Sequence, residues 1–388
     1  MQIARKVSHW HEACELFCCP PMRQWNKNQI ENYLRSALGH NTEVCDFRVL
    51  GTDPEERSLK SYGYGTPVRI EYRDADNQKK NAVLHTISPG PFGHEFMSDR
   101  AQELLWEHTA FNRLPRHVRS LDVGGIRSDG IIVPLGDVEE FCLLTGYAPG
   151  QGYFLDLERL RDGGELRALD VARADALCDY LVEIHRARGA DADAGLYVRR
   201  IRELVGGSEC IMGLIDSYDS GSSEEPGPLQ KIEQLCVEWR WMLKKKTGRL
   251  REVHGDFHPW NILFQDGADF CLLDRSRGEY GDPADDVACL TANYLFFSLQ
   301  RSGTIEGSFK ALFERFWNRY LERSRDHEIL EVIAPFYVFR ALVMASPLWY
   351  PNLPSLVRQR LFSFMRAVLE EERFHPDEVN EYCDTSSR

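Results

Sequence analysis

The sequence predicts an α+β protein in which a small β-rich part precedes a larger helical part, and two patterns lead to this expectation. Across residues 45–147, short runs rich in apolar and β-branched residues alternate with turn-rich segments, which is typical of antiparallel strands. Beyond residue 150, long stretches carry apolar residues at the three- and four-residue spacing of amphipathic helices. The texture changes at Ala148, Pro149 and Gly150, so we expect a short connection there.

The elements of the first part follow from local signals. The first forty residues indicate helix, and NQIENYLRSALGH ends at Gly39, a usual helix stop. The runs CDFRVLG, GTPVRIEYRD and NAVLHTI predict strands, and DADNQKK joins the last two as a hairpin. A helix is expected over residues 99–113, before Pro115, and further strands over GGIRSDGIIVPLGD and FCLLTGY.

Four long helical stretches dominate the second part: VARADALCDYLVEIHRAR, LQKIEQLCVEWRWMLKKK, GSFKALFERFWNRYLERS and EILEVIAPFYVFRALVMA. The segment SGSSEEPGP at 220–228 is typical of a loop. We therefore expect a helical extension over 1–44, a β-rich lobe over 45–144, a connection over 145–150 and a helical lobe over 151–388.

Composition and charge exclude some classes of protein. With 388 residues, of which 43% are apolar, the chain is long enough for two or three cores. Its 47 basic and 60 acidic residues give a net charge of −13, which disfavours a general nucleic-acid binder because such proteins gather Lys and Arg on their surface. A neutral or cationic small molecule is the better-fitting partner.

The compartment is expected to be the cytoplasm. No stretch of 18 apolar residues indicates a membrane span, and the N-terminus lacks the apolar run of a signal peptide. Eleven scattered cysteines predict buried free thiols rather than disulfides. His9, His11, Cys14, Cys18 and Cys19 match no standard zinc spacing, so structural packing is the favoured interpretation and a metal site the alternative.

The run VHGDFHPWNILF at 253–264 concentrates polar groups between apolar residues. A hairpin is predicted after it, formed by NILF, the turn QDGAD and FCLLD, and it returns Asp274 to the neighbourhood of Asp256 and Asn261. An Asp that accepts a hydroxyl proton, with an Asn and a second Asp that hold Mg²⁺, is the arrangement of kinase phosphoryl transfer. Turn and cap residues alone would not explain all of these positions together.

HGDFHPWNILF followed by LLDRSRGEYGDPADDVA resembles the aminoglycoside phosphotransferase and choline kinase family, whose pattern is H-G-D-x-x-x-x-N, a later Asp, and G-D-P-x-x-D. The motif core covers 253–288, and the order of the lobes extends a looser match over about 45–370. The resemblance implies a protein kinase-like two-lobe fold and an enzyme that uses ATP or GTP with Mg²⁺.

The resemblance also implies site residues. Asp256 corresponds to the catalytic Asp, His254 to a residue that braces the catalytic loop, and Asn261 and Asp274 to the Mg²⁺ ligands. Structural support is expected from Asp282, as the N-cap of the next helix, and from Asp286, which would bond the loop backbone. For His258, packing within the loop is the favoured interpretation.

On the nucleotide side, the resemblance places a phosphate-covering turn at Gly63 and Gly65 and an adenine-binding connection near Thr145 and Tyr147. The strand position that is usually Lys or Arg in the family is His85, which is shorter and only partly charged near neutral pH. Two groups of residues leave alternatives open: Arg69 or Lys60 as a substitute cation, and Glu103 or Glu107 as its acidic partner.

The predicted function is transfer of a phosphoryl group to a hydroxyl of a small molecule, which could be aminoglycoside-, choline- or sugar-like. Only twelve residues separate Asp274 from Asp286, too few for the peptide platform of a protein kinase. A nucleotide-binding regulator without turnover is the alternative, motivated by His85 and by Arg275 beside the metal position. Candidate residues for the acceptor wall are Tyr153, Asp156, Glu158, Glu279, Trp349 and Tyr350.

Overall fold

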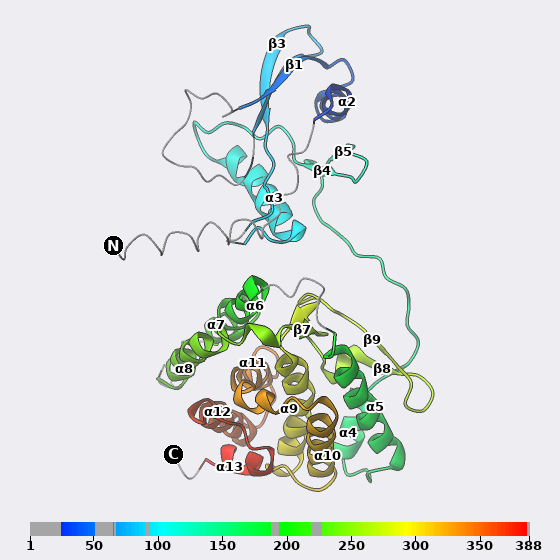
Figure 1. Ribbon diagram of the computed structural model, residues 1–388, viewed down its shortest axis with the longest axis vertical. Coiled ribbons are helices and arrows are strands. Elements are labelled where there is room, and N and C mark those ends of the chain that lie inside the picture. The colour runs from blue at the N-terminus through cyan, green and yellow to red at the C-terminus, as the bar shows by residue number, and fades with distance from the viewer. Residues whose placement is uncertain are drawn as a thin grey trace, which may run out of the picture. The chain divides into compact units, whose positions relative to one another are not determined.

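The computed structural model describes residues 25–50, 65, 67–90, 93–187, 194–218 and 227–385 of the chain. These residues form two compact units that divide between Thr145 and Gly146, and each unit is described by itself (Figure 1). The N-terminal histidine and cysteine cluster, most of the glycine-rich turn at 61–66 and residues 220–226 of the expected loop lie outside the described residues.

The described residues of the first unit form two small antiparallel sheets and two helices. A three-stranded sheet has the order β1-β2-β3, and β4 pairs with β5 in a separate hairpin. The elements are α2 (Lys27–Leu38), β1 (Glu43–Val49), β2 (Val68–Arg73), β3 (Lys79–Leu84), α3 (Met97–Arg113), β4 (Gly124–Ile126) and β5 (Ile132–Pro134).

Helix α2 shows how local signals become packing in this unit. The side chain of Asn26 accepts a hydrogen bond from the backbone N–H of Asn28 and caps the first turn. Buried Ile30, Tyr33 and Leu34 follow the helical spacing, and they form one core cluster with residues of the sheet strands. Gly39 ends the helix with a φ of 122°, a conformation that favours glycine.

Three expectations for this unit need correction. The strands do not form one sheet, because β4 and β5 pair only with each other. The run FCLLTGY at 141–147 contains no strand, since an apolar run forms one only where a partner strand offers backbone hydrogen bonds. Strand β3 ends at Leu84, so His85 lies just beyond it rather than within it.

The second unit is built around α9 (Pro283–Ser302), in which nearly every residue is buried. The apolar positions cover the whole circumference of the helix because other helices surround it (Figure 1). The further helices are α4 (Phe154–Arg161), α5 (Ala168–Ile184), α6 (Ala194–Gly206), α7 (Ile211–Asp216), α8 (Gly227–Leu243), α10 (Gly307–Ser324), α11 (Ala334–Ala345), α12 (Ser355–Glu370) and α13 (Val379–Tyr382).

Short strands frame the segment that carries the motif. Strand β8 (Ile262–Phe264) pairs with β9 (Phe270–Leu272) as the predicted hairpin. Strand β6 (Gln151–Gly152) pairs with the other edge of β8. Strand β7 (Arg251–Glu252) pairs with β10 (Tyr280–Gly281) before the start of α9. Residues 253–261 are therefore held between two strand pairs, with α9 beginning directly after β10.

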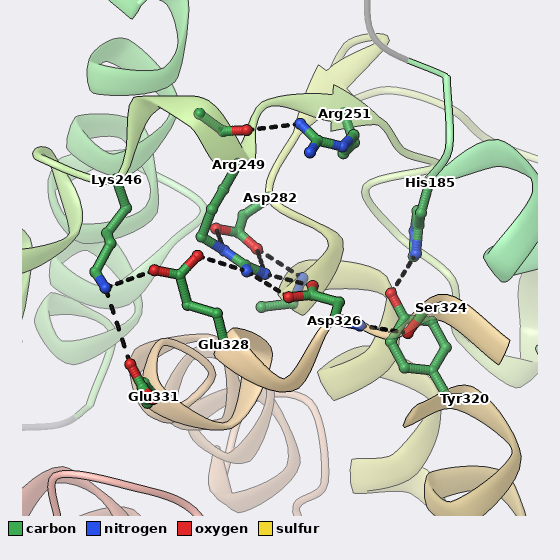
Figure 2. Close-up of polar contacts among 12 residues, drawn as sticks. His185, Lys246, Arg249, Arg251, Asp282, Tyr320, Ser324, Asp326, Glu328 and Glu331 are labelled. Carbon is green, nitrogen blue, oxygen red and sulfur yellow. Dashed lines mark hydrogen bonds and ion pairs between the residues drawn. The ribbon is translucent and has the colours of Figure 1, made fainter. Parts of the chain in front are cut away.

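The start of α9 is fixed by a buried ion pair. Asp282 accepts the backbone N–H of Ala284 as the expected N-cap, and Pro283 occupies the first turn. The two carboxylate oxygens of Asp282 each accept a hydrogen bond of 2.9 Å from the Arg249 guanidinium. Figure 2 shows the same guanidinium between Asp282 and Asp326, with Glu328 at its edge. The network joins α9 to the segment that precedes the motif.

No helix among the described residues is long and apolar enough to cross a membrane.

Replacing Asp282 with Ala should destabilise the second unit, because it removes the N-cap and leaves Arg249 buried without its main partner. We expect a loss of about 3 to 5 kcal/mol in unfolding free energy, the usual cost of removing one member of a buried pair. Thermal and urea unfolding of the variant would measure it. The matched control is Asp162→Ala, which breaks an exposed ion pair with Arg161 and should change little. Equal effects in the two variants would contradict the assignment.

Candidate active site

The catalytic loop predicted at 253–261 is tied to the first turn of α9 by one carboxylate. The backbone N–H groups of His254 and Gly255 donate to Asp286 at 2.8 and 2.7 Å, one to each oxygen. This is the contact with the loop backbone that the family resemblance implied for Asp286. The His185 ring at the end of α5 lies 3.2 Å from the same carboxylate. It also bonds the Tyr320 hydroxyl, a contact that can be followed in Figure 2.

Gly255 is required by the shape of the loop. Its φ of 83° lies in the left-handed region, and an added Cβ would stand 3.1 Å from the Cβ of Arg277. A larger residue here would strain the backbone and push against the segment after Asp274. The glycine of the H-G-D motif therefore has a geometric reason, independent of any chemistry.

His254 braces the loop from within. Its Nδ1 accepts the backbone N–H of Asp256 at 3.3 Å, and its ring packs edge-on against Phe257. Burial lowers the pKa of His254 below its ordinary value, and this effect exceeds the opposite influence of the Asp286 charge. A neutral imidazole is what the acceptor geometry at Nδ1 requires, so His254 holds the backbone of Asp256 in place.

Asp256 has two unlike carboxylate oxygens. Arg340 donates to Oδ1 at 2.5 Å, whereas Oδ2 has only longer contacts of 3.4 Å with His258 and Asn261. Burial would raise the pKa of Asp256, but the hydrogen bond from His258 and the Arg340 charge outweigh it and hold the pKa well below its ordinary value. The carboxylate is thus ionised at neutral pH, with Oδ2 as its less engaged oxygen.

Asn261 and Asp274 are brought together by the hairpin. The backbone N–H of Leu273 donates to the Asn261 carbonyl at 2.9 Å, so Asp274 follows directly beside Asn261. The Asn261 amide nitrogen donates to the Asp256 carbonyl at 3.1 Å, which leaves its Oδ1 available. One amide oxygen and one exposed carboxylate are hard donors of the kind that Mg²⁺ accepts together with water and phosphate oxygens.

The backbone at Asp274 is unusual. Its φ of 53° places a residue with a side chain in the left-handed region, where Asp is tolerated but few other residues are. Strained backbone of this kind gathers at ligand sites. Within the described part of the chain, no group of three or more His, Cys, Asp or Glu side chains converges.

The two arginines after Asp274 have partners other than those expected. Arg275 donates to the carbonyls of Val253 and Glu279 and pairs with Glu252, and Arg277 donates to the Cys210 sulfur at 3.1 Å. From the sequence alone, Arg275 and Arg277 could have neutralised phosphate or paired with Asp282 and Asp285, but Arg249 and Arg340 hold those two acids. Arg275 therefore closes the loop, and Arg277 joins it to the start of α7.

The candidate nucleotide-binding residues of the first unit are less closely grouped than the residues of the loop and hairpin. His85 is exposed just after β3, and both His85 and Glu107 line a mostly apolar cavity of about 2290 Å³ among α2, α3 and the strands. Glu103 instead bonds His94 at 2.5 Å. Arg69 pairs with Glu71 on its own strand and bonds Asn81 on β3.

The other nucleotide-side candidates are described in part. Gly65 is exposed, whereas Gly63 and Lys60 lie outside the described residues. Thr145 and Tyr147 flank the division between the two units in an irregular segment. Their assignment to nucleotide binding stays a prediction.

Some acceptor-wall candidates are occupied elsewhere. Tyr153 is wrong as a wall residue, because it is 1% exposed and bonds Tyr294 in the core. Asp156 pairs with Arg173 at 2.6 Å, and Glu158 lies 3.7 Å from Arg161. The remaining candidates are accessible at the surface or packed beside Phe296, namely Glu279, Trp349 and Tyr350.

Arg340 was missed from the sequence. It lies in an apolar stretch, FYVFRALVMA, which indicates a buried helix and marks no partner for a charged residue. A buried arginine nearly always has an acidic partner, so this composition signals an ion pair. It does not say which acid, because Asp256 is 84 positions away along the chain.

Comparison with known proteins agrees with this geometry. The model of the family described as "Phosphotransferase enzyme family" matches residues 143–327, so this part of the chain is similar to that family. The resemblance drawn from the motif is confirmed, and the strands and helices of the described residues confirm the α+β fold class. The protein is a phosphotransferase enzyme.

Several solved structures are also similar. A glucosamine kinase is 17% identical with a TM-score of 0.40, over 85% of this chain and 92% of that one. An amicoumacin kinase, in complex with AMP-PNP and Ca²⁺, is 14% identical with a TM-score of 0.39, over 84% and 92%. An ethanolamine kinase from Plasmodium vivax is 11% identical with a TM-score of 0.34, over 87% and 80%. No curated protein matches the chain.

Replacing Asp286 with Asn should destabilise the second unit in a pH-dependent way. Burial would raise the pKa of Asp286, but the bonds from His185 and the loop N–H groups keep it below its ordinary value. A carboxylate with a lowered folded-state pKa stabilises above its unfolded pKa, and this contribution is lost as pH falls through the folded-state value. We expect a deficit of about 3 kcal/mol at pH 7 that shrinks below about pH 4.

Urea unfolding followed by tryptophan fluorescence at pH 7 and at pH 3.5 would measure this deficit in Asp286→Asn relative to the native chain. The control is Asp175→Asn, whose carboxylate pairs with Arg315 at the surface. A deficit of equal size at both pH values would contradict the charged hydrogen bonds to Asp286.

Proposed function

We propose that the protein transfers the γ-phosphoryl group of ATP or GTP, with Mg²⁺, to a hydroxyl of a small molecule. The observation that carries the proposal is the convergence of Asp256, Asn261 and Asp274 on one loop and hairpin within the family-matched segment. A binding module would not need an ionised carboxylate with one oxygen left for a hydroxyl.

Asp256 would receive the acceptor hydroxyl at Oδ2. Arg340 already donates to Oδ1, so the hydroxyl hydrogen would be directed to the oxygen with the longer contacts. A carboxylate with a lowered pKa is a weak base, which suits phosphoryl transfer because its loose transition state needs an aligned nucleophile more than early proton removal. Asp256 therefore acts mainly by orienting the hydroxyl, and takes the proton as the new O–P bond forms.

Asn261 and Asp274 would hold Mg²⁺ through the amide Oδ1 and the carboxylate. When bound, the ion supplies charge neutralisation on the nucleotide phosphates. The bond from the Asn261 amide to the Asp256 carbonyl fixes which amide atom faces the ion, since only the oxygen remains as an acceptor. The two ligands are thereby coupled to the position of the catalytic Asp through one short loop.

Residues 45–144 are proposed to bind the nucleotide, and residues 145–150 are proposed to serve as the hinge. The backbone near Gly63, Gly65, Thr145 and Tyr147 would contact the nucleotide. His85 would replace the usual Lys or Arg with a weaker hold on phosphate, since its side chain is shorter and carries fewer hydrogen-bond donors. Glu107 is the better-supported acidic partner, because it lines the same cavity as His85 while Glu103 is bonded to His94.

The acceptor is proposed to be a small molecule of the aminoglycoside, choline or sugar kind. The short span from Asp274 to Asp286 holds only the β10 strand and the start of α9, which leaves little surface for a peptide. Pairing of Asp156 and Glu158 with arginines weakens the case for a strongly acidic wall. A neutral polyhydroxylated acceptor therefore fits as well as an amine. No observation favours the inactive-regulator alternative.

Asp256→Ala should abolish transfer and keep nucleotide binding, because Asp256 meets the acceptor and not the phosphates. Turnover should fall by at least about 100-fold, the usual contribution of a catalytic acid or base. Asp274→Ala should instead weaken binding of the Mg-nucleotide. Asp266→Ala, in the turn of the same hairpin, is the control and should behave like the native chain.

Calorimetric titration with ATP and GTP, with and without Mg²⁺, would measure binding. A γ-phosphate transfer screen over amines, sugars and aminoglycosides would measure turnover and identify the acceptor class. Full turnover in Asp256→Ala would show that the assigned mechanism is wrong, and nucleotide binding without transfer to any acceptor would favour the regulator.

A further inference from the structure

Arg340 lies on α11, beyond the end of the family-matched segment at residue 327. Its side chain is 7% exposed and bridges two acids, with one amino group on Asp256 at 2.5 Å and the other on Asp285 at 2.6 Å. The second amino group also donates to the Gly255 carbonyl at 2.8 Å. Three contacts therefore converge on the catalytic loop and the first turn of α9.

The guanidinium is also held from the side by aromatic packing. Its carbon lies 4.4 Å from the centroid of the Phe339 ring, and the Arg277 guanidinium lies 4.7 Å from the same ring. Since Arg277 bonds Cys210 at the start of α7, the arrangement links α7, α11 and the loop. A planar cation that is packed and hydrogen-bonded in this way has few alternative rotamers.

Charge balance gives the bridge a physical reason. The carboxylates of Asp256 and Asp285 both contact the Arg340 guanidinium, and a buried charge without a partner is strongly destabilising. Arg340 compensates both carboxylates at once and does so from an element that carries no motif residue. Neither Asp285 nor Arg340 is part of the H-G-D-x-x-x-x-N and G-D-P-x-x-D pattern.

We infer that Arg340 is a positioning residue of the transfer reaction, which fixes the rotamer of Asp256 so that Oδ2, and not Oδ1, faces the acceptor hydroxyl. The inference rests on the proposed function and adds α11 to the reaction machinery. Arg340 acts through Asp256 and needs no contact with nucleotide or acceptor. Its loss would let Asp256 rotate, which lowers the fraction of complexes with an aligned nucleophile.

Arg340→Met should lower kcat by about 100-fold, the usual effect of misplacing a reacting group by about 1 Å. The KM for nucleotide should stay unchanged, because Arg340 contacts neither Asn261 nor Asp274 among its bonds. Arg340→Lys should recover part of kcat, since a single ammonium can bond Oδ1 but cannot fork to both acids. Asp285→Asn should have an intermediate effect, because Arg340 keeps its bond to Asp256.

The matched control is Arg358→Met. Arg358 lies on α12 and donates to the carbonyls of Ala345 and Tyr350, so it packs against the end of α11 without touching an acid of the site. Its loss should lower the thermal unfolding temperature and leave kcat unchanged. If Arg340→Met and Arg340→Lys both kept native kcat, or if kcat fell equally in Arg358→Met, the positioning assignment would be overturned.

A double-mutant cycle separates this inference from the proposed function. The unfolding temperature is measured for Asp256→Asn, Arg340→Lys and the double variant, without any activity assay. Contact between the two side chains predicts that the double variant loses less than the sum of the single losses. Additive losses would overturn the inference even in an active kinase, whereas non-additive losses without transfer to any acceptor would instead refute the proposed function.

Discussion

The arrangement of the second unit depends on the carboxylate of Asp286, which receives the backbone N–H groups of His254 and Gly255 in a buried setting. Two loop N–H groups without partners would each carry a desolvation cost, so the loop closes on this carboxylate. Once the loop is held there, the left-handed Gly255 turns the chain and His254 bonds the N–H of Asp256. The geometry of the loop that holds Asp256 is thus a consequence of satisfying backbone groups.

Three acidic residues at the start of α9 each bind a different segment of the chain. Asp282 binds Arg249 from the segment before the loop, Asp285 binds Arg340 on α11, and Asp286 binds His185 at the end of α5. Carboxylates are favoured at a helix N-terminus because the helix dipole is positive there. Each acid then fixes a different segment, so one helix end brings together elements that are distant along the chain.

Buried ion pairs of this kind contribute more to the orientation of side chains than to the stability of the fold. Replacing a buried ion pair by apolar residues is often neutral for folding, whereas removing one partner is costly. An apolar core around α9 would hold the helices together, yet it would not define which way a carboxylate points. Hydrogen bonds do define it, and at Asp256 they distinguish one oxygen from the other.

The sequence by itself determined the order of a β-rich part and a helical part, the hairpin after the motif and the N-cap at Asp282, because these depend on local periodicity and turn chemistry. It did not determine the separate sheets of the first unit or the end of β3 before His85, since strand pairing depends on partners elsewhere in the chain. Only the tertiary structure decided that Arg340 meets Asp256 and that Arg249, not Arg275 or Arg277, meets Asp282. Ion pairs between distant segments are chosen by packing, and a charge in a sequence does not name its partner.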